Sequence, residues 1–383
     1  MTAVAVLEQR INRSTLDVVL RPTEPVMSVY LGTAPDVANE YQLAWETRWA
    51  PLATALVDQG ADRATVSALE NALMVPASAR AARGMGQVAG FARDGDVLAV
   101  VTLPELGGPD VARYAAPAHM LPLARWAQDR PAYVHVVIDR TGADLAASIG
   151  AGEEPVRSVV EGPDDEIERN APGGWEGLTQ GRYQRRAEDS WAHNAGAVAD
   201  AVTDYLRRVE ARILVVSGDV RAQQLLLDRL PEWVRRGVRV KRITGSRSSD
   251  GSQKVRGEAV ARAVREAVDD EMSVLWQTFL EERSPHGLSV EGARETLAAL
   301  SGGRVATLLV SAEPDDVAAW FGPSPTDVWP FGEGDPVPPE ARKGSLVDVA
   351  VRAALLTSAQ VRVIPPDAGY WPMEGVGGIC RYR

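Results

Sequence analysis

The eight residues from Ala132 to Asp139 constrain the fold more than any other part of the chain. They read Ala-Tyr-Val-His-Val-Val-Ile-Asp, rich in β-branched residues and without the polar alternation of a half-exposed strand. Such a run is typical of a strand buried on both faces of a sheet. A turn at Asp139 to Gly142 and the run Ala143 to Ile149 predict a hairpin. Periodicity then predicts a helix at 182–209, a strand at 212–217, a helix at 220–230 and a strand at 238–243. This order is typical of an α/β domain.

Similar patterns precede and follow this unit. At 383 residues the chain is long enough for two or three domains, and we predict three, with bounds 1–130, 131–252 and 253–383. The expected fold class is α/β (α+β) throughout. In the first segment we expect a strand at 26–31, helices at 41–56 and 62–74, and a hairpin of 87–91 with 97–103. In the third we expect helices at 257–282, 290–300 and 346–358, strands at 305–310, 360–364 and 376–382, and a surface loop or lid at 321–339.

The net charge of −11 gives no overall positive field that would hold the chain on DNA or on an anionic membrane. The charge is unevenly distributed, however. The stretch from Arg235 to Arg256, called here the basic stretch, has eight bases and the single acid Asp250. Residues 271–383 carry 9 bases and 15 acids, a net of −6. Local contact with RNA and a protein-binding C-terminal segment are therefore both compatible with the composition.

Common catalytic and cofactor signatures are missing from the sequence. The four histidines stand far apart, and no HExxH, GxGxxG, GxxxxGK[ST] or GxSxG pattern occurs. His135 lies inside the buried run, so we predict a hydrogen-bonded core residue. Cys380 is the single cysteine, which excludes an internal disulfide and any Cys-rich metal site. We expect no metal and no cofactor. No run of about 18 apolar residues and no cleavable leader pattern is present, so we expect a cytoplasmic protein with no membrane partner.

A glycine-rich segment precedes the long predicted helix and leads into an arginine cluster. Positive charge in the first turn of a helix opposes the helix dipole and costs a few tenths of a kcal/mol up to about 1. Bound RNA would reverse this cost, because guanidinium groups pair with phosphate and stack on bases. The segment from Gly173 to Arg186, called here the finger, therefore predicts RNA contact, and a surface loop without a ligand is the equal alternative. The candidate residues are Gly173, Gly174, Trp175, Gly177, Gln180, Arg182, Arg185 and Arg186.

The basic stretch is the second candidate for RNA contact. Its loop, Thr244 to Gln253, is rich in glycine and serine and can follow a phosphate backbone without reading its sequence. A solvated connector is the alternative. The alternation in Val238-Arg239-Val240-Lys241 predicts both bases on one face of an edge strand, where charge also opposes aggregation. The candidate residues are Arg239, Lys241, Arg242, Arg247 and Lys254.

Three short matches together resemble a known family. They are Arg182-Tyr183-Gln184-Arg185-Arg186 with Val198-Ala199-Asp200, Leu297 to Leu300 with Gly303 and Val305 to Val310, and the ending Glu374 to Tyr382. In this order they resemble the bacterial relatives of archaeal and eukaryotic release factor 1 and Pelota, a group that includes the ribosome hibernation factor Balon and its actinobacterial counterparts. The resemblance implies three domains. These are a small N-terminal α/β domain facing the decoding centre, a ribonuclease-H-like middle domain with a loop directed to the peptidyl-transferase centre, and an L7Ae-like α/β/α sandwich that meets a translational GTPase.

The sequence differs from that family at two functional loops, the Gly-Gly-Gln loop and the decoding-side loop. Release factors use Gly-Gly-Gln to stabilise the reacting centre during ester hydrolysis, and this tripeptide occurs nowhere in the sequence. Glu176, Gly177 and Leu178 stand at the matching positions, and Gln180 could serve only if the loop shifts. The decoding-side loop, Thr33 to Tyr41 with Asp36, Asn39 and Tyr41 as candidates, lacks Asn-Ile-Lys-Ser. No catalytic residue is therefore assigned, and Gln180 is the alternative.

Three functions remain open at this point. The resemblance implies a non-enzymatic factor that occupies the A site of the 70S ribosome, contacts 16S and 23S rRNA and keeps idle ribosomes inactive. Elongation factor Tu is the candidate delivery partner. The alternative is a peptidyl-tRNA hydrolase that rescues ribosomes through Gln180. The third is a stress-associated protein that binds another protein through its acidic C-terminal domain.

Overall fold

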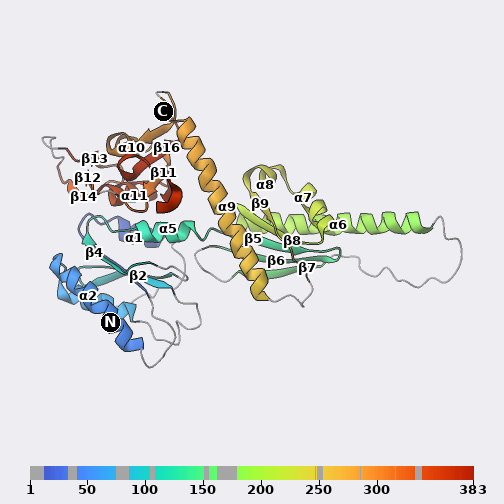
Figure 1. Cartoon of the computed structure of the whole chain (residues 1–383), viewed down its shortest axis with the longest axis horizontal. Coiled ribbons are helices and arrows are strands. Elements are labelled where there is room, and N and C mark those ends of the chain that lie inside the picture. The colour runs from blue at the N-terminus through green and yellow to red at the C-terminus, as the bar shows by residue number, and fades with distance from the viewer. Residues whose placement is uncertain are drawn as a thin grey trace. The chain divides into compact units, whose positions relative to one another are not determined.

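The structure is a computed structural model that divides into two compact units (Figure 1). Unit 1 comprises Met1–Gln128 and Val274–Arg383, and unit 2 comprises Asp129–Ser273. The described residues are 13–32, 41–74, 86–103, 108–150, 155–161, 179–245, 247, 253–284, 286–314, 316–332 and 339–383. Only the backbone is described for residues 13–16, 41–44, 179–193, 253–254 and 367.

Unit 2 is built on a five-stranded sheet in the order β7-β6-β5-β8-β9. The central strand β5 is antiparallel to β6 and parallel to β8, β7 is antiparallel to β6, and β9 is parallel to β8. The ribonuclease-H-like assignment that the resemblance implies for this sheet stays a prediction. The buried run of the sequence forms β5, whose five residues from Val134 to Ile138 are all buried, as predicted. The strands are β5 (Tyr133–Ile138), β6 (Gly142–Ser148), β7 (Val156–Glu161), β8 (Ile213–Gly218) and β9 (Arg239–Arg242).

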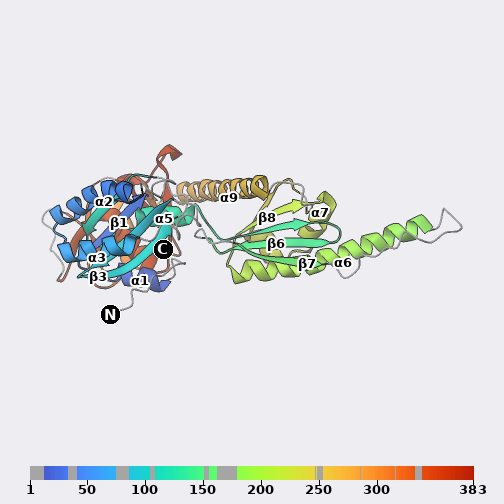
Figure 2. The ribbon, with the colours of Figure 1, turned by 90° about the horizontal axis from the view of Figure 1, so that it is seen from below.

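Helices cover both faces of this sheet. Val198, Val202 and Leu206 of α6 pack with α7 and α8 on one face, over Val134, Val136 and Leu214 among others. On the other face, Val260, Val264 and Ala267 of α9 pack over Ile213 and Val215. Figure 2 shows the N-terminal part of α6 continuing beyond the strands. The helices are α6 (Thr179–Arg208), α7 (Val220–Arg229), α8 (Glu232–Gly237) and α9 (Gln253–Glu281), the last of which ends in unit 1.

The N-terminal part of unit 1 is a four-stranded sheet in the order β3-β2-β1-β4 with helices packed on it. Trp45 and Trp49 of α2 and Leu69 and Leu73 of α3 enter its core. Asp62 caps α3 because its carboxylate accepts the backbone N–H of Thr65. The elements are α1 (Arg13–Leu20), β1 (Val26–Gly32), α2 (Tyr41–Asp58), α3 (Arg63–Leu73), β2 (Gln87–Arg93), β3 (Asp96–Leu103), β4 (Val111–Ala115) and α5 (Leu121–Gln128).

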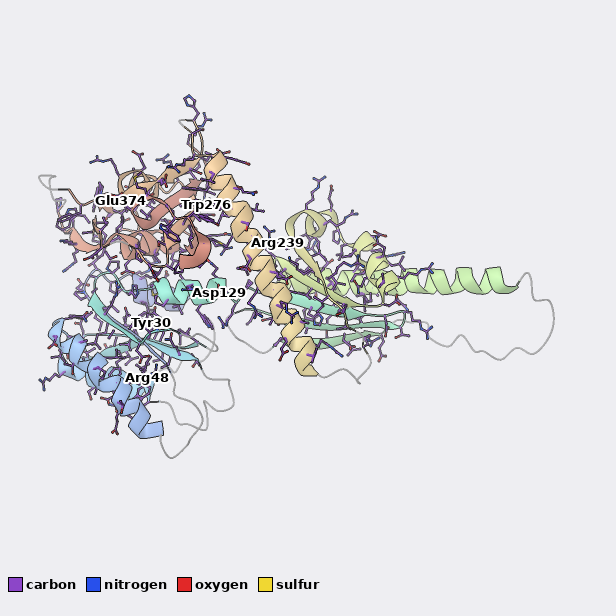
Figure 3. The ribbon with its side chains drawn as sticks, in the orientation of Figure 1. Tyr30, Arg48, Asp129, Arg239, Trp276 and Glu374 are labelled. Atoms are coloured by element: carbon purple, nitrogen blue, oxygen red, sulfur yellow. The ribbon has the colours of Figure 1, made fainter. Side chains whose placement is uncertain are left out.

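The C-terminal part of unit 1 has two sheets, in the orders β10-β16-β11-β15 and β13-β12-β14. Cys380 ends β16, inside the strand predicted at 376–382, and its side chain is buried. The Glu374 carboxylate accepts the backbone N–H of Ala293 in the first turn of α10, at 2.6 Å (labelled in Figure 3). The elements are β10 (Ser289–Glu291), α10 (Gly292–Ser301), β11 (Val305–Ser311), β12 (Ala318–Phe321), β13 (Val328–Pro330), β14 (Arg342–Ser345), α11 (Leu346–Leu356), β15 (Gln360–Ile364), η1 (Pro366–Ala368), η2 (Met373–Gly375) and β16 (Val376–Cys380).

The prediction of a surface loop at 321–339 is only partly right for the described residues of that segment, because residues 322–327 connect two short strands. Phe321 belongs to β12, β13 lies inside the segment, and Phe321 and Val328 are fully buried. Phe321 pairs with Val328 across the two strands. The prolines and glycines of the segment suggest a loop, yet strands of three or four residues are too short to give a periodic signal. Residues 333–338 lie outside the described part.

Buried polar contacts join the two parts of unit 1. His119 Nδ1 lies 2.9 Å from Asp348 Oδ1, and both side chains are buried. Tyr30, labelled in Figure 3, donates its hydroxyl hydrogen to the backbone oxygen of His119 at 2.8 Å. The mixed α/β fold class is confirmed, while the predicted bounds at 130/131 and 252/253 stay predictions.

Candidate functional site

The finger is carried by the long helix of unit 2. Gly173, Gly174, Trp175 and Gly177 lie outside the described residues. Gln180, Arg182, Arg185 and Arg186 lie in the first turns of α6, where the backbone alone is described. Asn194 of the same helix donates to the backbone oxygen of Arg140 at 3.1 Å. This bond fixes α6 against the turn at the end of β5, so the part of the helix before Asn194 extends past that end of the sheet (Figure 2).

Arg247 of the basic stretch is held at the same end of the sheet. Its guanidinium group lies 3.1 Å from Asp139 Oδ1 and 3.0 Å from Asp144 Oδ1, and it also donates to the hydroxyl of Thr141. Burial alone raises the pKa of Asp139. Hydrogen bonds from Thr141 and Arg247, with the charge of Arg247, outweigh burial and lower the pKa below its usual value. Arg247 thus ties the loop after β9 to the hairpin of β5 and β6.

Three further bases of the basic stretch, Arg239, Lys241 and Arg242, lie on the two faces of β9. Arg239 and Lys241 pair in register with Ile213 and Val215, so they lie on the α9 face of this edge strand, as the alternation predicts. Lys241 Nζ donates to Asp270 of α9 at 2.7 Å, and this hydrogen bond lowers the pKa of Asp270. Arg242 lies on the opposite face and donates to Gln223 at 2.9 Å. The side chain of Lys254 is not described.

Three of the five candidate bases in this stretch therefore form hydrogen bonds or ion pairs within the protein: Lys241, Arg242 and Arg247. Contact of these side chains with RNA stays a prediction. The stretch is also not one continuous surface, because its members lie at different ends and on different faces of the sheet.

His135 is the buried histidine of unit 2, and it is hydrogen-bonded as predicted. Its Nε2 lies 3.0 Å from the Ser217 hydroxyl oxygen, and its side chain is buried beneath α9. Burial, with the charge of Arg256, lowers the pKa of His135 from 6.5 to about 4. The imidazole is therefore neutral in the folded protein near neutral pH.

This histidine should make the stability of unit 2 depend on pH. Its pKa is lower in the folded state than in the unfolded state, so stability is full above pH 6.5 and is lost as pH falls toward 4. Between pH 7 and pH 5 we expect its contribution to fall by about 2 kcal/mol. Urea unfolding of the full chain, followed by hydrogen exchange at β5, measures this. His135→Leu should remove that part of the pH dependence, whereas His286→Gln, at an exposed site, should leave it. An unchanged pH dependence in His135→Leu contradicts the assignment.

The decoding-side candidates fall at the border of the described residues. Asp36 and Asn39 lie outside them, and Tyr41 begins α2 with its side chain not described. Both ends of this segment are anchored by a pair that the sequence did not suggest. Arg48, labelled in Figure 3, makes two hydrogen bonds to the Asp110 carboxylate, at 2.8 and 2.9 Å. Asp110 also accepts the backbone N–H of Gly32 at 2.8 Å. A Cβ atom at Gly32 would lie 2.5 Å from Arg48 Nη2, so a side chain at this position would require the guanidinium group of Arg48 to shift.

Neither a metal site nor a membrane-spanning helix is found in the described part of the chain. No group of three or more His, Cys, Asp or Glu side chains there is arranged to hold a metal ion. Among the helices of those ranges, none is both long and apolar enough to cross a membrane.

Residues 132–285 match the model of a protein family described as "Bacterial archaeo-eukaryotic release factor family 2". The match begins one residue before β5 and includes the whole five-stranded sheet and α9. Unit 2 resembles a release-factor domain. The resemblance found in the sequence is thereby confirmed.

Among curated proteins, the chain is similar to an uncharacterized protein of Mycobacterium tuberculosis strain H37Rv. The two are 28% identical over 371 residues, which cover 94% of this chain and 93% of that protein. An uncharacterized protein of strain CDC 1551 matches at the same identity and coverage.

Solved structures of release factors and their relatives also match the chain. The archaeal translation termination factor aRF1 is 15% identical with a TM-score of 0.24, over 97% of this chain and 99% of that one. Archaeal Pelota, in a model of its ribosome-bound form with ABCE1, is 14% identical with a TM-score of 0.39, over 98% and 96%. Dom34 of S. cerevisiae, described as a translation termination-like factor, is 8% identical with a TM-score of 0.37, over 77% and 80%.

Proposed function

We propose that this release-factor-like protein binds the 70S ribosome in its A site and keeps idle ribosomes inactive. The observation that carries the proposal is a release-factor-like domain without the tripeptide that release requires. Residues 132–285 match the family model, yet the sequence contains no Gly-Gly-Gln. A chain of this kind keeps the means to enter the site and lacks the group that stabilises the hydrolytic transition state. Acting there, it would be cytoplasmic and would contact 16S and 23S rRNA.

The geometry of α6 supports a role for the finger. The helix is 30 residues long, and the bond from Asn194 to the turn after β5 leaves its first 15 residues beyond the sheet. At 1.5 Å per residue these span about 22 Å. Arg182, Arg185 and Arg186 lie on this projecting part. In the proposal they reach the 23S rRNA around the peptidyl-transferase centre, and the decoding-side segment with Asp36, Asn39 and Tyr41 faces the 16S rRNA.

Co-sedimentation with ribosomes tests this proposal. The triple variant Arg182→Ser, Arg185→Ser, Arg186→Ser should bind purified 70S ribosomes at least 10-fold more weakly, because three contacts to phosphate or bases are lost. The matched control is Arg262→Ser, Arg265→Ser, Arg294→Ser, which removes the same charge from exposed positions of α9 and α10. Equal sedimentation of both triple variants and the unmodified chain would rule out the finger. Failure of the unmodified chain to sediment would overturn ribosome binding itself.

A release assay on the same ribosomes distinguishes a factor that only occupies the A site from a peptidyl-tRNA hydrolase. With labelled peptidyl-tRNA bound, the proposal expects no release above background. Release that disappears in Gln180→Ala would establish the alternative, a peptidyl-tRNA hydrolase that uses Gln180.

Elongation factor Tu is the proposed delivery partner. This part of the proposal is supported by the resemblance to the release factor and Pelota family. Binding of the purified factor in its GTP form to the full chain tests it. If both the factor and the ribosome fail to bind, the third hypothesis is favoured, a stress-associated protein whose acidic C-terminal domain binds another protein.

A further inference from the structure

Arginines gather at the end of unit 2 opposite the finger. Helix α6 ends at Arg208, and β8 and β9 both begin at this end of the sheet. The backbone N–H of Arg239 donates to the backbone oxygen of Arg212 at 2.8 Å, which brings the starts of the two strands together. Arg239 is labelled in Figure 3. We call this surface the arginine end; it comprises Arg207, Arg208, Arg212, Trp233, Arg235, Arg236 and Arg239.

The charge of the arginine end is positive and largely available to a ligand. Residues 204–212 and 228–239 carry seven arginines and four acids, a net of 7 − 4 = +3. Arg208 and Arg236 form ion pairs with Asp204 and Glu232, one turn earlier in their own helices. Exposed pairs of this kind contribute little and exchange readily for a phosphate. Among the described residues, Arg207, Arg212 and Arg235 have no ion pair, and all three are exposed.

An exposed tryptophan lies within these charges. Trp233 of α8 is 40% exposed, and the guanidinium carbon of Arg207 lies 5.2 Å from its ring centroid. This contact joins the end of α6 to α8 and places a guanidinium group over one face of the exposed ring. Aromatic rings and guanidinium groups both accept a stacked nucleobase, and every base has a face suited to them. Positive charge alone suits any polyanion, whereas charge combined with an aromatic plane favours single-stranded nucleic acid.

We propose that the arginine end is a second RNA-binding site, at which arginines pair with phosphates and Trp233 stacks on an unpaired base. The proposal takes RNA as the ligand from the proposed function but does not depend on the finger. Helix α6 links the two sites, and its 30 residues correspond to roughly 45 Å. A single-stranded RNA segment some distance from the finger contact is therefore the expected ligand.

Binding of a fluorescently labelled 12-nucleotide uridine RNA to the full chain tests this site. The variant Arg207→Ser, Arg212→Ser, Arg235→Ser should bind at least 10-fold more weakly. The slope of log affinity against log salt should fall by about 2, since each phosphate contact on single-stranded RNA contributes about 0.7. Trp233→Ala should weaken binding by about 5-fold or more without changing the slope, because stacking releases no counterions.

Two controls separate the possible outcomes. The variant Arg262→Ser, Arg265→Ser, Arg294→Ser should bind the RNA as the unmodified chain does. Polyglutamate should compete poorly with the RNA. Unchanged affinity in the arginine-end variant overturns the site, as does a Trp233→Ala variant that binds normally while polyglutamate competes as well as RNA. The finger variant could lose 70S binding and still bind the oligonucleotide. That result would concern the proposed function and would not contradict the RNA site at the arginine end.

Discussion

Replacing Gly218 by alanine is expected to destabilise unit 2 by at least about 3 kcal/mol. Gly218 ends β8 with φ of +116°, a conformation that L side chains rarely adopt. A Cβ atom there would lie 1.8 Å from the backbone oxygen of Ile138. That oxygen ends the central strand β5 and accepts the N–H of Asp219. The added atom must therefore separate β5 from β8 and displace Asp219, which caps α7.

Hydrogen exchange gives the direct readout for Gly218→Ala. Amides of β5 and β8 should lose protection by more than 100-fold, since about 3 kcal/mol corresponds to a factor of that size. Gly237→Ala is the matched control, because no atom lies within 4 Å of a Cβ atom at Gly237. Native protection in Gly218→Ala would show that the β5 and β8 ends are not packed as described.

The second large effect is expected at Arg352 in unit 1. This side chain of α11 is 1% exposed. It donates to the backbone oxygens of Leu20 at 2.8 Å and Pro323 at 3.2 Å, and its guanidinium carbon lies 5.2 Å from the ring centroid of Phe321. Burial lowers its pKa from the usual value. Arg352→Ala leaves two carbonyl oxygens without their donor and creates a cavity, so we expect a loss of about 4 kcal/mol.

Urea unfolding monitored by hydrogen exchange at β1 and β11 measures the effect of Arg352→Ala. Arg352→Met keeps most of the side-chain volume and should recover part of the loss, which separates packing from hydrogen bonding. Arg294→Ala, on the exposed face of α10, should change stability by less than about 0.5 kcal/mol. If Arg352→Ala behaves like Arg294→Ala, the link between α1 and α11 is not the one described.

Much of the fold could be predicted because it rests on local patterns. The buried run at 132–139 became β5, the periodic segment at 182–209 became α6 (Thr179–Arg208), and the strand at 360–364 was found with its predicted bounds. The elements β4 and α5 were not predicted, because both are short and prolines interrupt the sequence before residue 130. Short strands depend on cross-strand partners for their stability, and a single sequence does not display those partners.

The contacts of the candidate site were less predictable. Arg247 pairs with Asp139 across 108 residues of sequence, and Lys241 pairs with Asp270 on another element. Composition showed that these bases are concentrated in one stretch, but their neutralising partners come from the tertiary fold. Trp233 was missed for the same reason, because its significance depends on Arg207 at the end of α6. The one usable signal was the recurrence of arginine in two segments that both precede a predicted strand.

Cryo-electron microscopy of 70S ribosomes mixed with the purified full chain tests the central claim most directly. The account predicts density for the chain in the A site, with the N-terminal part of α6 directed toward the peptidyl-transferase centre and the arginine end in contact with a second RNA segment. Ribosomes whose A sites are empty at saturating concentrations of the chain, or a chain bound only outside the A site, would contradict it.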